Sequence, residues 1–238
     1  MKRALENKIA VVTGGSGAIG SAIIAGLEQQ GACAVSLDVA PPAAAHFQAC
    51  DVRDDGSLAS ALANVQNTYG RLDLVVHAAG VSREAVIWKL AVEDWDLVQS
   101  VNLRGAFLLL RHAIPVMRAG EGGRIVLIGS INGSRGKFGT SAYSASKAGL
   151  IALAKTVARE VARLRILINV VEPGWVRTPL TDSLPQAVRD AALGENLVGK
   201  YVEPADVAAA VTFLCGPGAQ QITGQILRVD GGQSLGSV

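Results

Sequence analysis

The chain has 238 residues, of which 50% are hydrophobic, and its formal net charge is +2. This length suits one α/β domain or two small ones, and the hydrophobic fraction is enough for a large buried core. No run of lysine or arginine stands out, so we expect no nucleic acid among the partners. Since no linker or change of composition marks a boundary, we interpret residues 1–238 as a single domain.

The three cysteines, Cys33, Cys50 and Cys215, are widely separated and form no C-x-x-C pair. We therefore expect no metal site and no disulfide framework, and we place the protein in the reducing cytoplasm. Residues 9–27 carry no charge, but five glycines interrupt them. A strand, a tight turn and a helix explain this stretch better than a membrane span or a signal core, so we expect no membrane association.

Short apolar runs alternate with longer helical patterns along the chain. The predicted strands are 9–12, 32–37, 47–50, 72–77, 124–128, 166–171 and 226–229. The predicted helices are 19–30, 57–69, 92–118, 142–164 and 204–214. This alternation predicts an α/β fold with a doubly wound parallel sheet of about seven strands, Rossmann-like, covered by helices on both faces. Residues 173–202 contain three prolines and are predicted to be an irregular substrate loop or lid.

A glycine-rich turn follows the first predicted strand. Gly15, Gly17 and Gly20 fit the pattern G-x-G-x-x-G, directly before a predicted helix. Glycines there allow a tight turn and let backbone N–H groups approach a pyrophosphate at the helix N-terminus. The alternative is a glycine-rich turn that binds no ligand.

An acidic residue, Asp38, ends the second predicted strand, 18 residues after Gly20. A carboxylate at this position accepts hydrogen bonds from the adenosine ribose hydroxyls and repels a 2′-phosphate. No arginine or lysine in the glycine turn or just after Asp38 offsets that repulsion. We therefore predict NAD rather than NADP as the cofactor. The alternative for Asp38 is a solvated turn carboxylate.

Tyr143 and Lys147 lie four residues apart at the start of a predicted helix, so they share one face. A free tyrosine has a pKa of about 10 and is a poor acid or base at neutral pH. A nearby ammonium favours the phenolate and lowers that pKa, which suits exchange of a proton with an alcohol. Ser130 precedes this pair and Asn102 lies in an earlier helical stretch. As an exposed helical pair, Tyr143 and Lys147 would have no chemical role.

With these features the sequence resembles the short-chain dehydrogenase/reductase family over essentially its whole length. The motifs that carry the resemblance are the turn 13–20, Cys50-Asp51-Val52, His77-Ala78-Ala79-Gly80, Val101-Asn102, Gly129-Ser130, the segment 143–147, Pro173-Gly174 with Thr178, and Val229-Asp230-Gly231-Gly232. The chain departs from the family pattern at Ala18, where glycine is usual, and at His77-Ala78, where two asparagines are usual. We interpret His77 as a packing residue at a strand end rather than as a catalyst.

The resemblance implies a catalytic set and a cofactor site. Tyr143 would be the acid/base, Lys147 would tune it and bind the nicotinamide ribose, Ser130 would orient the carbonyl, and Asn102 would hold a relay water. The residues expected at the cofactor are Gly14, Ser16, Gly17, Ala18, Ile19, Gly20, Asp38, Asp51, Val52, Ala79, Gly80, Tyr143, Lys147, Pro173, Gly174, Val176 and Thr178. Asp51 and Val52 would contact adenine, and Val176 and Thr178 the carboxamide end.

The substrate is less well defined by the sequence. Expected contacts are Ser130, Asn132, Tyr143 and Trp175, with Trp88, Glu172, Leu180 and Leu184 as further candidates. Their apolar members suggest a partly apolar substrate, although Trp88 and Trp175 are equally compatible with a core or an interface. Glu172 either binds a polar substrate group or is a paired carboxylate.

Within the family, the resemblance is strongest to β-ketoacyl reductases and 3-hydroxyacyl-CoA dehydrogenases. Basic residues could line a route for a phosphorylated carrier or be scattered surface charge: Arg83, Lys89, Arg135, Lys137 and Lys200. We expect an NAD-linked oxidoreductase for a 3-hydroxyacyl or 3-ketoacyl thioester or a small secondary alcohol. The alternatives are a dehydrogenase of a sugar, steroid or cyclic alcohol, and a nucleotide-sensing protein without catalysis. Family members are commonly tetramers, so the resemblance implies a homotetramer.

Overall fold

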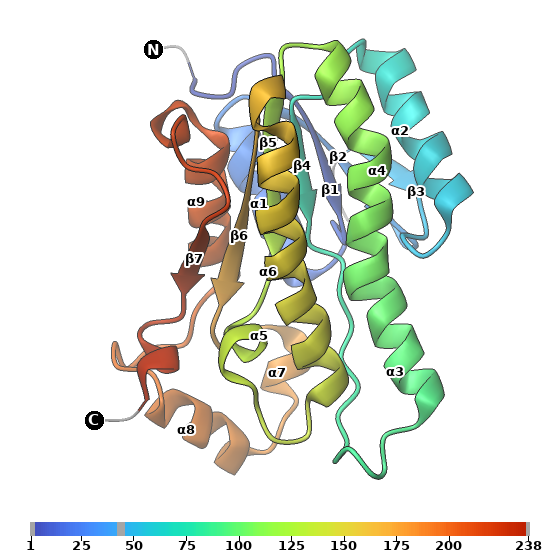
Figure 1. The fold of residues 1–238 in the computed structure, drawn as a ribbon. Helices are drawn as coiled ribbons and strands as arrows, with labels where there is room; N and C mark the ends of the chain where they lie inside the picture. The colour runs from blue at the N-terminus through green and yellow to red at the C-terminus, as the bar shows by residue number, and fades with distance from the viewer. Residues whose placement is uncertain (1–2, 42–45, 237–238) are drawn as a thin grey trace.

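A seven-stranded parallel sheet forms the centre of the molecule (Figure 1). The computed structural model describes residues 3–41 and 46–236. The strands are β1 (Ile9–Thr13), β2 (Cys33–Asp38), β3 (His46–Ala49), β4 (Leu74–His77), β5 (Gly123–Ile128), β6 (Ile166–Pro173) and β7 (Ile226–Val229). Their order across the sheet is β3-β2-β1-β4-β5-β6-β7. The predicted doubly wound α/β fold is confirmed, and each predicted strand is present.

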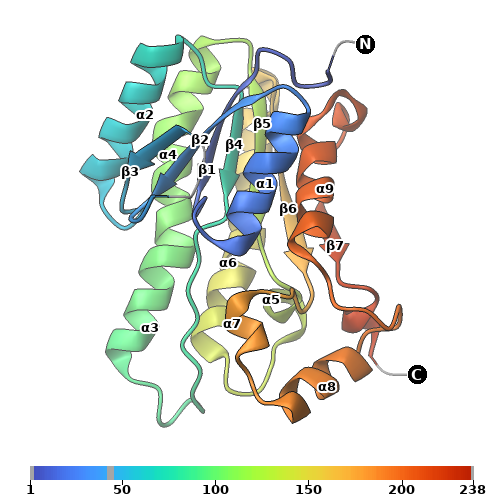
Figure 2. The same cartoon turned by 180° about the vertical axis from the view of Figure 1, so that it is seen from behind.

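Helices cover both faces of this sheet. On one face lie α2 (Asp55–Tyr69), α4 (Gly105–Ala119) and α6 (Ser141–Val161). The opposite face is covered by α1 (Ala18–Gln29) and α9 (Pro204–Cys215), as Figure 2 shows. Within residues 3–41 and 46–236, no helix combines the length and the apolar character that crossing a membrane requires.

Successive residues of a strand belong to two separate apolar clusters, one on each face of the sheet. Val11 and Leu127 belong to the cluster under α2, α4 and α6, whereas Val12 and Val126 belong to the cluster under α1 and α9. Side chains alternate between the faces of a strand, so a sheet covered on both faces needs apolar residues at every position. This requirement explains the nearly continuous apolar runs of the central strands.

The helix predicted over 92–118 is interrupted. α3 (Val92–Gln99) continues through a π-helical turn, η1 (Ser100–Arg104), into α4. Within that turn the Asn102 carboxamide binds the backbone of Val81: Oδ1 accepts from the N–H at 2.8 Å and Nδ2 donates to the carbonyl at 2.9 Å. A π-turn takes up one extra residue, a common device at functional sites. The partner that holds Asn102 lies 21 residues away, so helical periodicity alone could not reveal the interruption.

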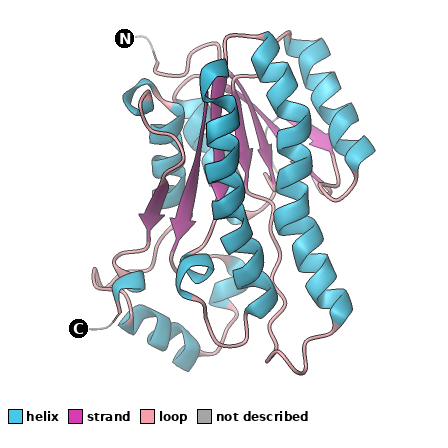
Figure 3. Cartoon of the chain, in the orientation of Figure 1, coloured by secondary structure: helices cyan, strands magenta, loops and turns pink. Residues whose placement is uncertain are grey.

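The segment 173–202 is not irregular as predicted. It contains α7 (Pro179–Asp182) and α8 (Gln186–Gly194), which are visible in Figure 3. Pro179 is the first residue of α7, and Pro185 precedes α8. Proline fixes φ near the helical value and lacks an N–H that a first turn does not need, so these prolines begin helices. The side chain of Leu180, a candidate substrate contact, lies outside the described residues.

Helix packing against the sheet gives a first prediction. Leu109 in α4 is fully buried in the cluster with Leu127, and we expect Leu109→Ala to lower the free energy of unfolding by about 3 kcal/mol. Leu235→Ala, the same change at a position that is 76% exposed, should stay within about 0.5 kcal/mol of the wild type. Urea denaturation measures both variants, and equal losses would contradict the packing described for α4.

Candidate active site

The residues expected at the site come from the carboxyl ends of the strands. Thr13, Asp38, His77, Ile128 and Pro173 are each the last residue of a strand. Because all seven strands are parallel, these ends lie at one edge of the sheet. The strand order reverses between β1 and β4, and a crevice at such a reversal is where ligands bind in doubly wound folds.

The glycine-rich turn is closely packed between β1 and α1. Gly14 has φ +69°, and a Cβ on it would lie 2.5 Å from the Ala79 nitrogen. A Cβ on Gly20 would collide with the Gly14 carbonyl oxygen. The expected cofactor residues Gly14, Gly20 and Ala79 are therefore brought together, and only glycine fits at the first two.

The N-terminus of α1 is left without a side-chain cap. Gly17 is the N-cap residue, makes no side-chain hydrogen bond, and is followed by no acidic residue in the first turn. Ala18 and Ile19 therefore present backbone N–H groups that have no partner within the helix. Such groups, together with the helix dipole, can bind the pyrophosphate of a dinucleotide. α1 begins at Ala18, so the alanine that replaces the usual glycine is accommodated in the helix.

Asp38 lies against the glycine turn. Its Oδ2 accepts a hydrogen bond from the Ser16 backbone at 3.0 Å, and Oδ1 accepts from the Val39 N–H at 2.7 Å. The Ser16 hydroxyl donates to the Ala40 carbonyl. The carboxylate is thus fixed beside the end of β2, at the position that the sequence predicts for a ribose contact.

The two residues expected at adenine differ in their surroundings. Asp51 forms an ion pair with Arg53, with 2.7 Å between Oδ2 and Nη2, and this arginine lowers the pKa of Asp51. Val52 is buried, and the absence of a side chain at Gly105 lets α4 approach it: a Cβ there would lie 3.1 Å from Val52 Cγ2. The Asp51 carboxylate is therefore already neutralised by a neighbour.

Lys147 carries a buried ammonium group at the centre of the site. The residue is 4% exposed, and Nζ donates to the Ile128 carbonyl at 2.8 Å. Burial lowers the pKa of Lys147 to about 8. A Cβ on Gly80 would lie 3.4 Å from this Nζ and 3.5 Å from Asn102 Oδ1, so Gly80 brings the loop after β4 close to both side chains.

Tyr143 is half-buried beside this ammonium, and Lys147 Nζ lies 5.6 Å from the centre of its ring. Burial raises the pKa of Tyr143, and a hydrogen bond from Ser130 acts in the opposite direction. The sequence predicts a lowered pKa for Tyr143, whereas in the structure the effect of burial outweighs those that would lower it. The ammonium is directed at the Ile128 carbonyl, whereas the phenol loses its contact with water. Tyr143 accordingly holds its proton at neutral pH.

Ser130 connects the end of β5 to a short helix, α5 (Ile131–Arg135), that the sequence did not reveal. As the N-cap of α5, the Ser130 hydroxyl oxygen accepts from the Asn132 N–H at 3.2 Å. Ser130 also acts to lower the pKa of Tyr143, which indicates that the two side chains lie near each other. The structure thus brings together Ser130, Tyr143 and Lys147, as the sequence predicts.

The structure places the expected substrate contacts in different surroundings. The Asn132 side chain lies on α5 directly after Ser130 and accepts from Arg135 Nε at 3.4 Å. The Trp175 ring packs under Lys137, whose Nζ lies 5.1 Å from the ring centre. Trp88, in contrast, is 77% exposed, so it is not a core residue. Val176, expected at the carboxamide end, is buried and paired in a β-bridge with Val202.

His77 is fully buried and makes more specific contacts than a packing residue needs. Its Nε2 lies 3.2 Å from the Asn102 carbonyl oxygen and its Nδ1 lies 2.9 Å from Thr13 Oγ1. A carbonyl can only accept, so Nε2 must donate, and Nδ1 accepts from the Thr13 hydroxyl. Burial, reinforced by the charge of Lys147, lowers the pKa of His77 to about 3. The neutral imidazole therefore joins β1, β4 and the π-turn.

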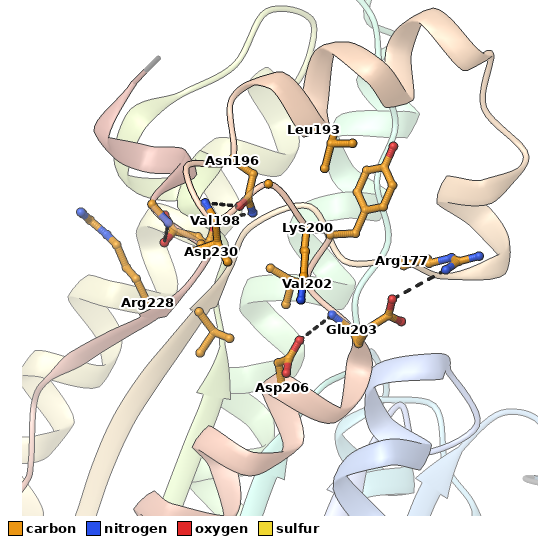
Figure 4. A pocket seen from close by; sticks show the side chains of 15 residues that line it. Arg177, Leu193, Asn196, Val198, Lys200, Val202, Glu203, Asp206, Arg228 and Asp230 are labelled. Carbon is orange, nitrogen blue, oxygen red and sulfur yellow. Dashed lines mark hydrogen bonds and ion pairs between the residues drawn. The ribbon is translucent and has the colours of Figure 1, made fainter. Parts of the chain in front are cut away.

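An open pocket lies elsewhere in the described part of the chain. It has a volume of about 970 Å³ and is lined by α8, the segment that follows it, the end of β7 and the start of α9 (Figure 4). None of Asn102, Ser130, Tyr143 and Lys147 lines it. Its charged side chains include the ion pair of Arg177 with Glu203, with 3.8 Å between Nη1 and Oε1. We therefore do not assign the chemistry to this pocket.

Comparisons with known proteins agree with the fold described above. A family model described as enoyl-(acyl carrier protein) reductase matches residues 16–234. The 3-oxoacyl-[acyl-carrier-protein] reductase FabG of Thermotoga maritima is 34% identical, over 96% of this chain and 98% of that protein. The (3R)-3-hydroxyacyl-CoA dehydrogenase of Canis lupus familiaris is 37% identical, over 96% of each chain. The crystal structure of gox2181 superposes with a TM-score of 0.95 at 29% identity, over 98% of each chain.

The buried His77 predicts an unusual dependence of stability on acid. Its folded pKa lies below the unfolded value of about 6.5, so the unfolded chain binds the extra proton and the folded state loses stability as the pH falls below that value. From pH 6.5 to 4.5 the wild type should lose about 2–3 kcal/mol more than His77→Asn. Urea unfolding at both pH values measures this, with His77→Gln as a second variant. Equal losses in wild type and variants would contradict the buried neutral imidazole.

Proposed function

Because the chain belongs to the short-chain dehydrogenase/reductase family of oxidoreductases, we propose that it interconverts a 3-ketoacyl and a 3-hydroxyacyl thioester with NAD(H). The observation that carries the proposal is the cluster of Ser130, a protonated Tyr143, and the buried ammonium of Lys147, which lies 5.6 Å from the centre of the Tyr143 ring. A bound nicotinamide supplies or accepts the hydride, and the protein manages the proton.

In this proposal Tyr143 is the proton donor to the ketone oxygen. Its raised pKa keeps the phenol protonated at neutral pH, which suits the reducing direction. Ser130 would hold the same oxygen, because its hydroxyl acts on the phenol of Tyr143 and lowers its pKa. Two donors at one oxygen would stabilise the negative charge that develops there.

Lys147 and Asn102 support this proton transfer. A positive charge at Lys147 stabilises the phenolate that remains when Tyr143 has given up its proton. Both N–H bonds of the Asn102 carboxamide are used, by Val81 and Ser146, so this side chain has no donor left for a relay water. The Asn102 carbonyl accepts one hydrogen bond from His77 and has a second lone pair for such a water.

The surroundings of α1 fit a dinucleotide, and the position of Asp38 favours NAD. The free N–H groups after Gly17 would hold the pyrophosphate, and Asp38 would accept bonds from the ribose hydroxyls. A 2′-phosphate would meet the Asp38 carboxylate, and the chain from 39 to 50 has no lysine or arginine to neutralise it. Gly80, Val176 and Thr178 would border the nicotinamide end.

A thioester substrate is supported by what the named relatives share. The bacterial reductase and the mammalian dehydrogenase carry in their names the same 3-oxo or 3-hydroxy acyl group on different carriers. Of the basic residues considered for a carrier, Arg83 pairs with Asp94 and Arg135 with Glu195, whereas Lys89 and Lys137 are exposed. We therefore favour coenzyme A, whose phosphates suit a few lysines.

We also propose a homo-oligomer. Phe107 on α4 and Phe213 on α9 are each about half exposed on opposite faces of the sheet, 48% and 49% respectively. Large exposed aromatic side chains on helices are typical of protein interfaces. Sedimentation of the intact protein tests this proposal.

A substrate panel tests the proposed reaction. We expect purified protein with NADH to reduce acetoacetyl-CoA faster than simple cyclic ketones. The loss of NADH absorbance measures both rates. Tyr143→Phe should lower kcat by about 10³-fold without changing the Kd of NADH, because the ring remains and only the acid is lost. Tyr69→Phe, at the end of α2, is the matched control and should keep its activity. Full activity of Tyr143→Phe would contradict the proposed acid.

Removal of the Asp38 carboxylate tests the cofactor. Asp38→Ser should raise the ratio of kcat/KM with NADPH to that with NADH by at least about tenfold, because it removes a like charge from the 2′-phosphate. Asp96→Ser, on the exposed surface of α3, should leave the ratio unchanged. A wild-type enzyme that already prefers NADPH would overturn this assignment of Asp38.

A further inference from the structure

Glu172 is a carboxylate with no exposed surface, at the end of β6. Its Oε1 accepts a hydrogen bond from the Ser134 hydroxyl at 2.7 Å, and its Oε2 lies 3.2 Å from Arg228 Nε. Glu172 is therefore a paired carboxylate, and it has no exposed surface that a substrate group could contact. A buried carboxylate is costly unless its partners are well placed, so this arrangement calls for a structural reason.

The two partners of Glu172 come from different elements. Arg228 is its register neighbour on β7, and Ser134 lies on α5. Between them the Glu172 side chain crosses Gly129: a Cβ on that glycine would lie 3.2 Å from Glu172 Cγ. Gly129 also donates its N–H to the Val171 carbonyl at 2.7 Å. Glu172 thus spans from the sheet to the far end of the 129–134 segment.

The position of α5 decides where the Ser130 hydroxyl points. The helix has only five residues, and its N-cap bond is made by Ser130 itself. A Cβ on Gly133 would lie 2.8 Å from the backbone carbon of Lys147, so α5 rests directly on α6. A helix this short has little stability of its own and depends on tertiary contacts. The bond from Ser134 to Glu172 is one such contact, made by a fully buried acceptor.

We infer that Glu172 is a positioning residue for the reaction, which acts through Ser134 to hold α5 so that Ser130 stays beside Tyr143. The inference rests on the proposed function, because it assigns Ser130 to the ketone oxygen. Glu172 itself touches neither Ser130 nor Tyr143 in any hydrogen bond described for it. Arg228 neutralises the carboxylate and fixes its direction from the β7 side.

The consequences for Tyr143 give a readout beyond simple destabilisation. The bond from Ser130 lowers the pKa of Tyr143 against the effect of burial. When α5 shifts and this bond lengthens, the pKa of Tyr143 rises further. Oxidation of the 3-hydroxyacyl thioester needs the phenolate, so the rising limb of its pH–rate profile should move to higher pH.

The test compares Glu172→Gln and Ser134→Ala with the wild type. Each variant should lower kcat with acetoacetyl-CoA by about tenfold, since small misplacements of reacting groups have large effects on rate, while the Kd of NADH stays unchanged. The double variant should lose little more than either single variant, because both changes break one connection. Ser134→Thr, which keeps the hydroxyl, should restore most of kcat and the wild-type pH profile.

Asp73→Asn is the matched control. Asp73 is another buried carboxylate with basic partners, Lys8 and Arg71, but it precedes β4 at the opposite edge of the sheet. It should lower the melting temperature and leave kcat and the pH profile unchanged. If Glu172→Gln behaves like Asp73→Asn in all three respects, Glu172 has only a structural role and the inference is overturned. A wild-type protein that reduces none of the ketones would instead refute the proposed function.

Discussion

The candidate site depends on one buried charge held by a backbone carbonyl. The ammonium of Lys147 has almost no contact with water and donates to Ile128 at the end of β5. This bond fixes α6 against the sheet, because a buried ammonium without a partner would cost several kcal/mol. Two glycines then let neighbouring segments approach: Gly133 on α5 and Gly80 after β4. The end of β5, α5 and the loop after β4 therefore all pack against one residue, Lys147.

The strands were the most predictable part of the molecule, for a physical reason. Every residue of β1 and β4 is buried, so these strands are continuous apolar runs that need no knowledge of the partner. The interruption at Ser100–Arg104 could not be predicted in this way, because it depends on the contact of Asn102 with Val81. The helices over 179–194 were not predicted, because a proline can end a helix as well as begin one. At α7 the capping bonds of Thr178 show that Pro179 begins a helix, and these bonds are visible only in the structure.

The proximity of Tyr143 and Lys147 could be predicted from the sequence, but the direction of the ammonium could not. The spacing of Tyr143 and Lys147 predicts that they share a face, as they do, whereas the direction of the ammonium depends on the Ile128 carbonyl across the core. His77 had no local signal for its role, since its partners Thr13 and Asn102 come from two other elements. Glu172 was noticed because a charge in an apolar strand is unusual, yet its partners on α5 and β7 emerge only from the fold.

The bridge between Val176 and Val202 has a consequence for the segment that lies between them. The Arg177 N–H bonds to the Val202 carbonyl at 2.8 Å, so α7 and α8 leave the body and return to it at adjacent points. A segment whose two ends are already joined adds little loop-closure entropy when its length changes. The stretch between them can thus be exchanged as one unit while the sheet and the residues at its carboxyl edge stay unchanged.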